Sequence, residues 1–187
     1  MSISAMRKRM PASPDATLFA SSSAVVDASI LFNFIMIRQL ENLARSFQVL
    51  LITPLVYGEV KNRKQRKLVD ELVKKGLIEY TEPDVHEEYL ATSMAHRAYG
   101  KEVSDADKEA CVVARSRGYL LLVQDEPMRK IATKGLKMDA SKILDTVDCI
   151  KRLVLSGDIT EFEGKEMLER INKDRLPRKP LQWDGRE

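Results

Sequence analysis

Short apolar runs alternate with helical patterns along most of this chain of 187 residues. The runs are short and rich in Val, Leu and Ile, which predicts buried strands rather than helices. They read SAVVD, FQVLLIT, LIEYTE and YLLLVQD, with LKMDA as a fifth, weaker candidate. Strands that alternate with helices form βαβ units, which place a parallel sheet between helical layers. The pattern therefore predicts an α/β fold, a three-layer α/β/α sandwich with a mainly parallel central sheet.

The segments between these runs have the spacing and the end signals of helices. Apolar residues recur at helical intervals through residues 29–46, with Ser29 as the expected N-cap. A second helix is expected to begin at Pro54 and to end at Gly76. Further helices are expected over residues 85–100, 104–118 and 126–135, and two more over residues 145–173.

Composition and chain ends indicate one soluble domain over residues 23–173. A flexible N-terminal tail (1–22) and a polar C-terminal tail (174–187) are expected to flank it. No apolar run approaches the roughly 18 residues that a membrane helix needs, and no apolar segment follows the basic N-terminal residues as in a secretory signal. Cys111 and Cys149 lack a metal-type spacing, and free thiols suit a reducing compartment. We therefore expect a cytoplasmic protein without a membrane partner.

Carboxylates lie where the predicted strands end and the following helices begin. Asp27 and Asp125 end two strands, Glu59 lies about a turn into a helix, and Asp105 and Asp107 open another helix. Each of them alone is explained by helix capping or by the helix dipole. The carboxyl ends of parallel strands meet at one edge of a sheet, so these acids are expected to converge there. Converging carboxylates repel each other and raise each other's pKa, and a bound divalent cation offsets this repulsion. Oxygen ligands of this kind suit Mg²⁺ or Mn²⁺.

Four segments that contain these acids resemble the acidic motifs of PIN-domain nucleases. They are AVVDAS, PLVYGEV, SDADKEACVVA and LLLVQDE, in this order. The resemblance covers about residues 23–150 and extends more weakly to Lys173. It implies that a metal site and catalytic centre are formed by Asp27, Glu59, Asp107 and Asp125.

Three further residues are supporting candidates beside these motifs. Ser29 matches a small hydroxyl residue that is often found next to the first acid of the family. Asp105 and Glu126 are additional acids, and Asp105 is an alternative to Asp107 as the third acid of the site. Val123 departs from the family pattern, which often has Thr or Ser two residues before the fourth acid.

The resemblance implies a function and a set of partners. PIN nucleases cleave RNA in a metal-dependent reaction, so we expect an Mg²⁺- or Mn²⁺-dependent endoribonuclease in which a metal-activated water attacks the phosphodiester bond. The family includes toxins of VapBC-type toxin–antitoxin pairs as well as RNA-processing nucleases. RNA, a small antitoxin protein and a second copy of the chain in a homodimer are the implied partners. The alternative is a catalytically inactive PIN fold that binds RNA or another protein.

A basic segment, KNRKQRK, follows Glu59 and holds five Lys and Arg residues within two helical turns. A solvated helix face is the ordinary explanation of such a segment. However, Arg63 lies four residues after Glu59 and shares its face, so Lys61, Arg63 and Lys64 are predicted to bind RNA phosphates. Aromatic residues are few, so base stacking is expected to contribute little. Weaker basic candidates are Lys101, Arg115, Arg117, Arg129 and Lys130.

Other chemistries find less support in the sequence. HEEYL begins like a zinc-protease motif, but Leu90 stands where the second His is needed, and both His86 and His96 fall in a predicted helix away from the acids. A receiver domain needs an acidic pair after the first strand, and a haloacid-dehalogenase-type phosphatase needs an Asp where Ser29 stands. Tyr89, Leu90, Met94 and Ala98 form a stripe that is expected to be core or dimer interface.

Overall fold

A central five-stranded sheet organises the computed structural model, which describes residues 22–94, 97–98, 101–174 and 180–183. All neighbouring strands in this sheet are parallel, in the order β3-β2-β1-β6-β7. The strands are β1 (Ala24–Val26), β2 (Leu50–Ile52), β3 (Ile78–Tyr80), β6 (Leu120–Leu122) and β7 (Ile143–Leu144). The α/β prediction is confirmed. The weakest predicted strand is wrong, because β7 lies after LKMDA and follows a 3₁₀ turn at Ala140–Lys142.

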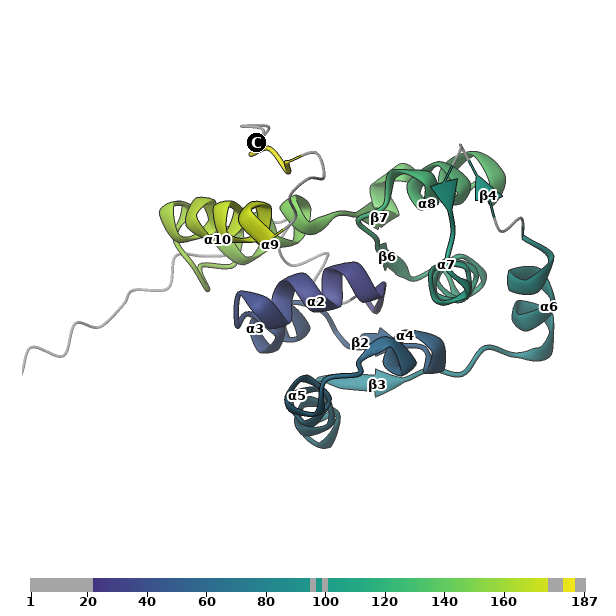
Figure 1. Ribbon diagram of the computed structural model, residues 1–187, viewed down its shortest axis with the longest axis horizontal. Helices are drawn as coiled ribbons and strands as arrows, with labels where there is room; N and C mark the ends of the chain where they lie inside the picture. Colours follow the sequence, from purple (N-terminus) through teal and green to yellow (C-terminus); the bar gives the residue numbers. More distant parts are fainter. Residues whose placement is uncertain (1–21, 95–96, 99–100, 175–179, 184–187) are drawn as a thin grey trace, which may run out of the picture.

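Helices cover both faces of this sheet (Figure 1). On one face lie α2 (Ala28–Met36), α3 (Leu40–Arg45), α5 (Arg63–Lys74), α9 (Thr146–Leu155) and α10 (Glu161–Asp174). On the other lie α6 (Val85–Ser93), α7 (Asp105–Arg117) and α8 (Glu126–Lys130), which runs on into a π-helical turn at Ile131–Gly135. The short α4 (Pro54–Glu59) contacts both α2 and α7. A separate antiparallel pair, β4 (Arg97–Ala98) and β5 (Lys101–Glu102), follows α6.

The first two predicted helices are each broken in two. In the first, Arg38 has a φ of 60°, and the chain turns before α3 begins at Leu40. The N-cap of α2 is Asp27, so the assignment of this role to Ser29 is wrong. In the second, the side chain of Asn62 accepts hydrogen bonds from the backbone N–H groups of the next turn and starts α5 as a new helix.

Two predicted helix ends are confirmed, and one is wrong. Gly76 and Gly118 have φ values of 68° and 69°, the left-handed conformation that glycine adopts without steric cost. The helix predicted over residues 85–100 ends earlier, at Ser93. His96, the second histidine of that predicted helix, lies outside the described residues.

The strands β1, β2 and β6 are fully buried and form the centre of a single hydrophobic core. Cys111 and Cys149 are buried free thiols, as predicted. Part of the C-terminal tail docks on this body: Asn172 exchanges two hydrogen bonds with the backbone of Leu181, and Trp183 packs against the core. In the described part of the chain, no helix is long and apolar enough to cross a membrane.

Candidate metal centre at the carboxyl edge of the sheet

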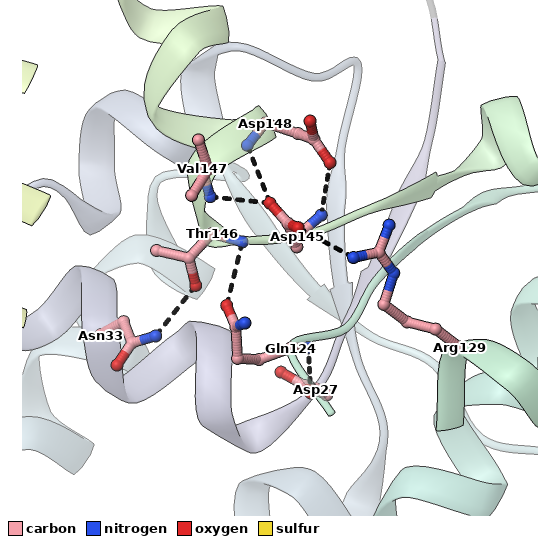
Figure 2. Close-up of polar contacts among 8 residues, drawn as sticks. All are labelled: Asp27, Asn33, Gln124, Arg129, Asp145, Thr146, Val147 and Asp148. Atoms are coloured by element: carbon pink, nitrogen blue, oxygen red, sulfur yellow. Dashed lines mark hydrogen bonds and ion pairs between the residues drawn. The ribbon is translucent and has the colours of Figure 1, made fainter. Parts of the chain in front are cut away.

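Asp27 lies directly after β1 and is 1% exposed. Its Oδ1 accepts a hydrogen bond of 2.6 Å from the backbone N–H of Ile30. Its Oδ2 accepts one of 3.0 Å from the backbone N–H of Gln124, which Figure 2 shows. The carboxylate therefore caps α2 and also joins the ends of β1 and β6. Burial raises the pKa of Asp27 to about 7; the two hydrogen bonds oppose this rise, and the charges of Asp107 and Asp125 add to it.

Asp107 and Asp125 act on Asp27, and Asp107 also acts on Glu59. Burial raises the pKa of Asp107, in the first turn of α7; bonds to Ser104 oppose this, and the charge of Asp125 adds to it. The pKa of Glu59, at the end of α4, is raised by burial and by Asp107. Asp125 occupies the N-cap position of α8, but its side chain makes no capping hydrogen bond. Four separate segments thus bring like charges to one edge of the sheet.

The supporting acids are arranged differently. Asp105 forms an ion pair of 2.9 Å with Lys108, and Glu126 forms one of 2.7 Å with Lys130. Both carboxylates are mostly exposed, and neither is among the charges that shift the pKa of Asp27. Of the two acids that open α7, Asp107 is therefore the one coupled to Asp27. Ser29 is half-buried in the first turn of α2.

The donor set fits a hard divalent cation. All four side chains offer carboxylate oxygens, which Mg²⁺ and Mn²⁺ prefer. The raised pKa values show that ionisation is disfavoured here, and a cation would reverse that preference. Among the described residues, no three His, Cys, Asp or Glu side chains are already gathered as a metal-binding group. The acids are therefore close enough to influence each other's pKa but are not closed into a ligand cage.

Asp27 is connected through Gln124 to a network of polar contacts (Figure 2). The side-chain oxygen of Gln124 accepts a hydrogen bond from the backbone N–H of Thr146 at 3.2 Å, and Asn33 donates one to the Thr146 hydroxyl at 2.9 Å. Asp145 caps α9 through a capping box, and it forms an ion pair of 2.9 Å with Arg129. The network joins the end of β6 to α2 and α9, and it fixes the segment whose N–H holds Asp27.

Sequence reasoning missed Gln124 and Asp145. Asp145 directly follows β7, just as Asp27 follows β1, so its position after a strand was the available signal. The signal was lost because the last strand was predicted too early in the chain. Gln124 offered no signal, because its contacts involve residues up to 97 positions away.

The predicted RNA-binding residues are exposed at the start of α5 and just before it. Lys61, Arg63 and Lys64 are all exposed, and the charge of Lys61 lowers the pKa of Glu59 against the larger effect of burial. Lys61 therefore lies near the acidic edge. The prediction that Arg63 shares a helix face with Glu59 is wrong, because Glu59 ends α4 and Arg63 begins the separate helix α5.

Most of the weaker basic candidates have partners within the protein. Arg129 and Lys130 are in the ion pairs described above, and Arg115 donates a hydrogen bond to the Leu136 carbonyl. Arg117 binds Glu87 of α6. The side chain of Lys101 lies outside the described residues. The stripe of Tyr89 was expected to be core or dimer interface. Tyr89 is 69% exposed, so the core alternative is wrong for this residue, and the dimer interface stays a prediction.

Comparison with known proteins identifies the family of this chain. A family model described as "DUF3368: PIN domain" matches residues 23–173, so the chain belongs to the PIN-domain family. Its fold is of the nuclease type, and this family generally uses a divalent metal. A solved structure, a PilT N-terminus domain protein, SSO1118, from the hyperthermophilic archaeon Sulfolobus solfataricus P2, is similar with 14% identity and a TM-score of 0.41. That match covers 74% of this chain and 97% of the archaeal one. No curated protein matches.

Proposed function

We propose that the protein is an Mg²⁺- or Mn²⁺-dependent endoribonuclease that hydrolyses RNA phosphodiester bonds at the carboxyl edge of its sheet. The observation that carries this proposal is the buried Asp27 carboxylate. Burial raises its pKa, and the charges of two carboxylates from distant segments, Asp107 and Asp125, add to this rise. No ion pair in the described part of the chain balances its charge, an arrangement that costs stability unless a cation is bound.

The residues have distinct roles in this proposal. Asp27, Asp107 and Asp125 would hold the cation, with Glu59 at the exposed side of the site. When bound, such a cation lowers the pKa of a water molecule and so supplies a hydroxide for in-line attack on phosphorus. The two backbone N–H groups on Asp27 fix the direction of its remaining lone pairs. Glu59, with its raised pKa, is suited to accept a proton from the attacking water.

The basic segment supplies the substrate contacts. Lys61, Arg63 and Lys64 are exposed next to Glu59 and would bind the phosphates that flank the scissile one. Such contacts position the RNA without reading its sequence.

A binding module without catalysis is the second candidate function. Two observations favour it: the described residues contain no preformed group of three metal ligands, and Val123 offers no hydroxyl beside Asp125. RNA binding without cleavage by the wild-type protein would support this alternative.

The test is cleavage of end-labelled single-stranded RNA by the full chain with Mn²⁺, with Mg²⁺ or with EDTA. We expect cleavage that depends on the metal. We expect Asp107→Asn to abolish it, because removing one charged ligand disables a site that works as a unit. Asp105→Asn is the matched control, two residues away in the same helical turn and ion-paired to Lys108, and it should retain most of the activity. Loss of activity in Asp105→Asn but not in Asp107→Asn would reverse the assignment.

A further inference from the structure

Two tyrosines and an arginine form a rigid cluster beside the basic segment. The rings of Tyr57 (α4) and Tyr80 (β3) pack edge to face, with centroids 5.1 Å apart and planes at 83°. Both hydroxyls donate hydrogen bonds to the same oxygen of Asp70 on α5, at 2.7 and 3.2 Å. The rings are therefore held in fixed orientations. Even so, Tyr80 is 46% exposed, which is unusual for an aromatic ring tied down in this way.

Arg66 completes the cluster on the side of Tyr57. Its guanidinium carbon lies 4.8 Å from the centre of the Tyr57 ring, in a cation–π contact. In the described part of the chain, the side chain of Arg66 makes no hydrogen bond and no ion pair, and its Nε is buried without a partner. A guanidinium group offers five N–H donors. The stacking thus holds Arg66 in place while leaving its donors without a protein acceptor.

The cluster lies at the same edge of the sheet as the acids. Leu51 pairs in register with Val25 on one side and with Glu79 on the other. Tyr80 is therefore level with Val26, the residue before Asp27. Tyr80 and Val26 are separated by two strand spacings, or about 10 Å. Arg66 is in the first turn of α5, three residues after Arg63. An RNA strand that follows the basic segment toward the acids would pass this cluster.

We propose that Tyr80 and Arg66 form a nucleotide subsite for single-stranded RNA, in which the Tyr80 ring stacks on a base and Arg66 donates to a neighbouring phosphate. The proposal rests on the proposed function and narrows its substrate to RNA with unpaired bases. Bases in a duplex are stacked on each other and cannot reach an aromatic side chain. An exposed ring beside a guanidinium is a common platform for single strands. This revises the expectation that base stacking contributes little.

The experiment measures binding rather than cleavage, in the full chain carrying Asp107→Asn and in the presence of EDTA. The probes are a fluorescent oligoadenylate, the same oligomer with abasic riboses at all positions, and a duplex RNA. Tyr80→Leu removes the ring, and Tyr80→Phe removes only the hydrogen bond to Asp70. Tyr89→Leu is the matched control, because Tyr89 is an exposed tyrosine on α6, on the other face of the sheet.

We expect Tyr80→Leu to weaken oligoadenylate binding by roughly 5- to 100-fold, the range for loss of one stacked base. Tyr80→Phe and Tyr89→Leu should bind nearly as tightly as the parent, and the abasic oligomer should not distinguish Tyr80→Leu from Tyr80→Phe. Equal oligoadenylate binding by Tyr80→Leu and Tyr80→Phe would overturn the subsite, as would an equal loss on duplex RNA or an absence of RNA binding in the parent. Because cleavage is not measured, an inactive wild type would refute the proposed function and leave this test intact.

Discussion

Asp27 and Glu87 are both buried carboxylates, with exposed fractions of 1% and 2%, yet their surroundings are opposite. Glu87 forms two hydrogen bonds with the guanidinium of Arg117, at 2.7 and 3.1 Å. It also accepts a backbone bond in the capping box of α6. Asp27 accepts two backbone hydrogen bonds, and the charges that shift its pKa are those of two more carboxylates. The charge of Glu87 is balanced by the guanidinium of Arg117, whereas no ion pair in the described part of the chain balances the charge of Asp27.

The difference separates a structural carboxylate, Glu87, from Asp27, which is proposed to bind a cation. Arg117 lies at the end of α7, and it also donates to the Thr81 hydroxyl and the Glu82 carbonyl after β3. The pair with Glu87 thus joins α6, α7 and the sheet, and the hydrogen bonds to Glu87 raise the pKa of Arg117. Asp27 gains no such compensation within the described chain. Burial of a carboxylate without a cation is tolerated where a bound cation completes the site.

Among single substitutions, the largest effect is expected from breaking the ion pair of Glu87 with Arg117. Arg117→Ala leaves Glu87 as an uncompensated buried charge, which should lower the free energy of unfolding by about 3 kcal/mol. Urea unfolding at neutral pH measures this change. Lys67→Ala is the control, because Lys67 and Glu71 form an exposed ion pair at 3.9 Å whose loss should change stability little. Equal effects of the two substitutions would mean that the pair contributes no more than a surface contact.

The unbalanced carboxylate should show itself in the pH dependence of stability. The pKa of Asp27 is about 7 in the folded protein, against the ordinary value of 3.8 that applies to the unfolded chain. The folded protein therefore binds this proton more tightly than the unfolded chain does. The contribution of this group is fully present below about pH 4 and is lost as pH rises through 7. In EDTA, stability should therefore fall over this interval by up to about 4 kcal/mol from Asp27 alone.

Asp27→Asn tests this assignment. The substitution removes the titrating group, and its amide faces the N–H of Gln124, so it loses that hydrogen bond at every pH. We expect lower stability than wild type at about pH 4 and a flatter dependence between about pH 4 and pH 7. Urea unfolding at several pH values measures both. Parallel curves for the two proteins would show that Asp27 does not titrate in this range.

The sequence predicted the group of acids around Asp27 better than the ion pair of Glu87 with Arg117. Asp27, Asp107 and Asp125 stand at strand ends and helix starts, positions that hydrophobic periodicity locates, and parallel topology then brings them to one edge. Glu87 and Arg117 are 30 residues apart, on two helices, and both lie among charged residues that a sequence pattern assigns to solvent. Hydrophobic periodicity gives no sign that they pair. Arg117 was accordingly a weaker candidate for RNA binding. Tyr57, Tyr80 and Asp70 also come from three elements whose packing depends on the tertiary structure.

Local side-chain chemistry accounts for the other differences. The break after α4 depends on the side chain of Asn62, and the break after α2 on a left-handed Arg38, whereas the apolar spacing continues through both. Asp27 is the instructive case, because capping and metal binding were weighed as competing explanations. The structure shows a cap that is also electrostatically coupled to the other acids.

The smallest expected effect separates these two roles. Asp27→Ala removes the cap of α2 and leaves the N–H groups of Ile30 and Gln124 without their acceptor, at a cost of about 1 kcal/mol. Near pH 7, removal of the buried charge and of its repulsion by the other acids offsets this cost. Asp125→Ala removes no capping hydrogen bond, so only the relief of repulsion acts, and the metal-free protein should be as stable as wild type or slightly more stable.

Thermal unfolding in EDTA and in Mn²⁺ measures the effects of both substitutions. If both residues hold the cation, Mn²⁺ should raise the Tm of the wild type and should raise it much less in either variant, because the metal binds only the folded site. A full Mn²⁺ response in Asp27→Ala with a lowered Tm in EDTA would reduce Asp27 to a helix cap. The same response in Asp125→Ala would remove Asp125 from the site.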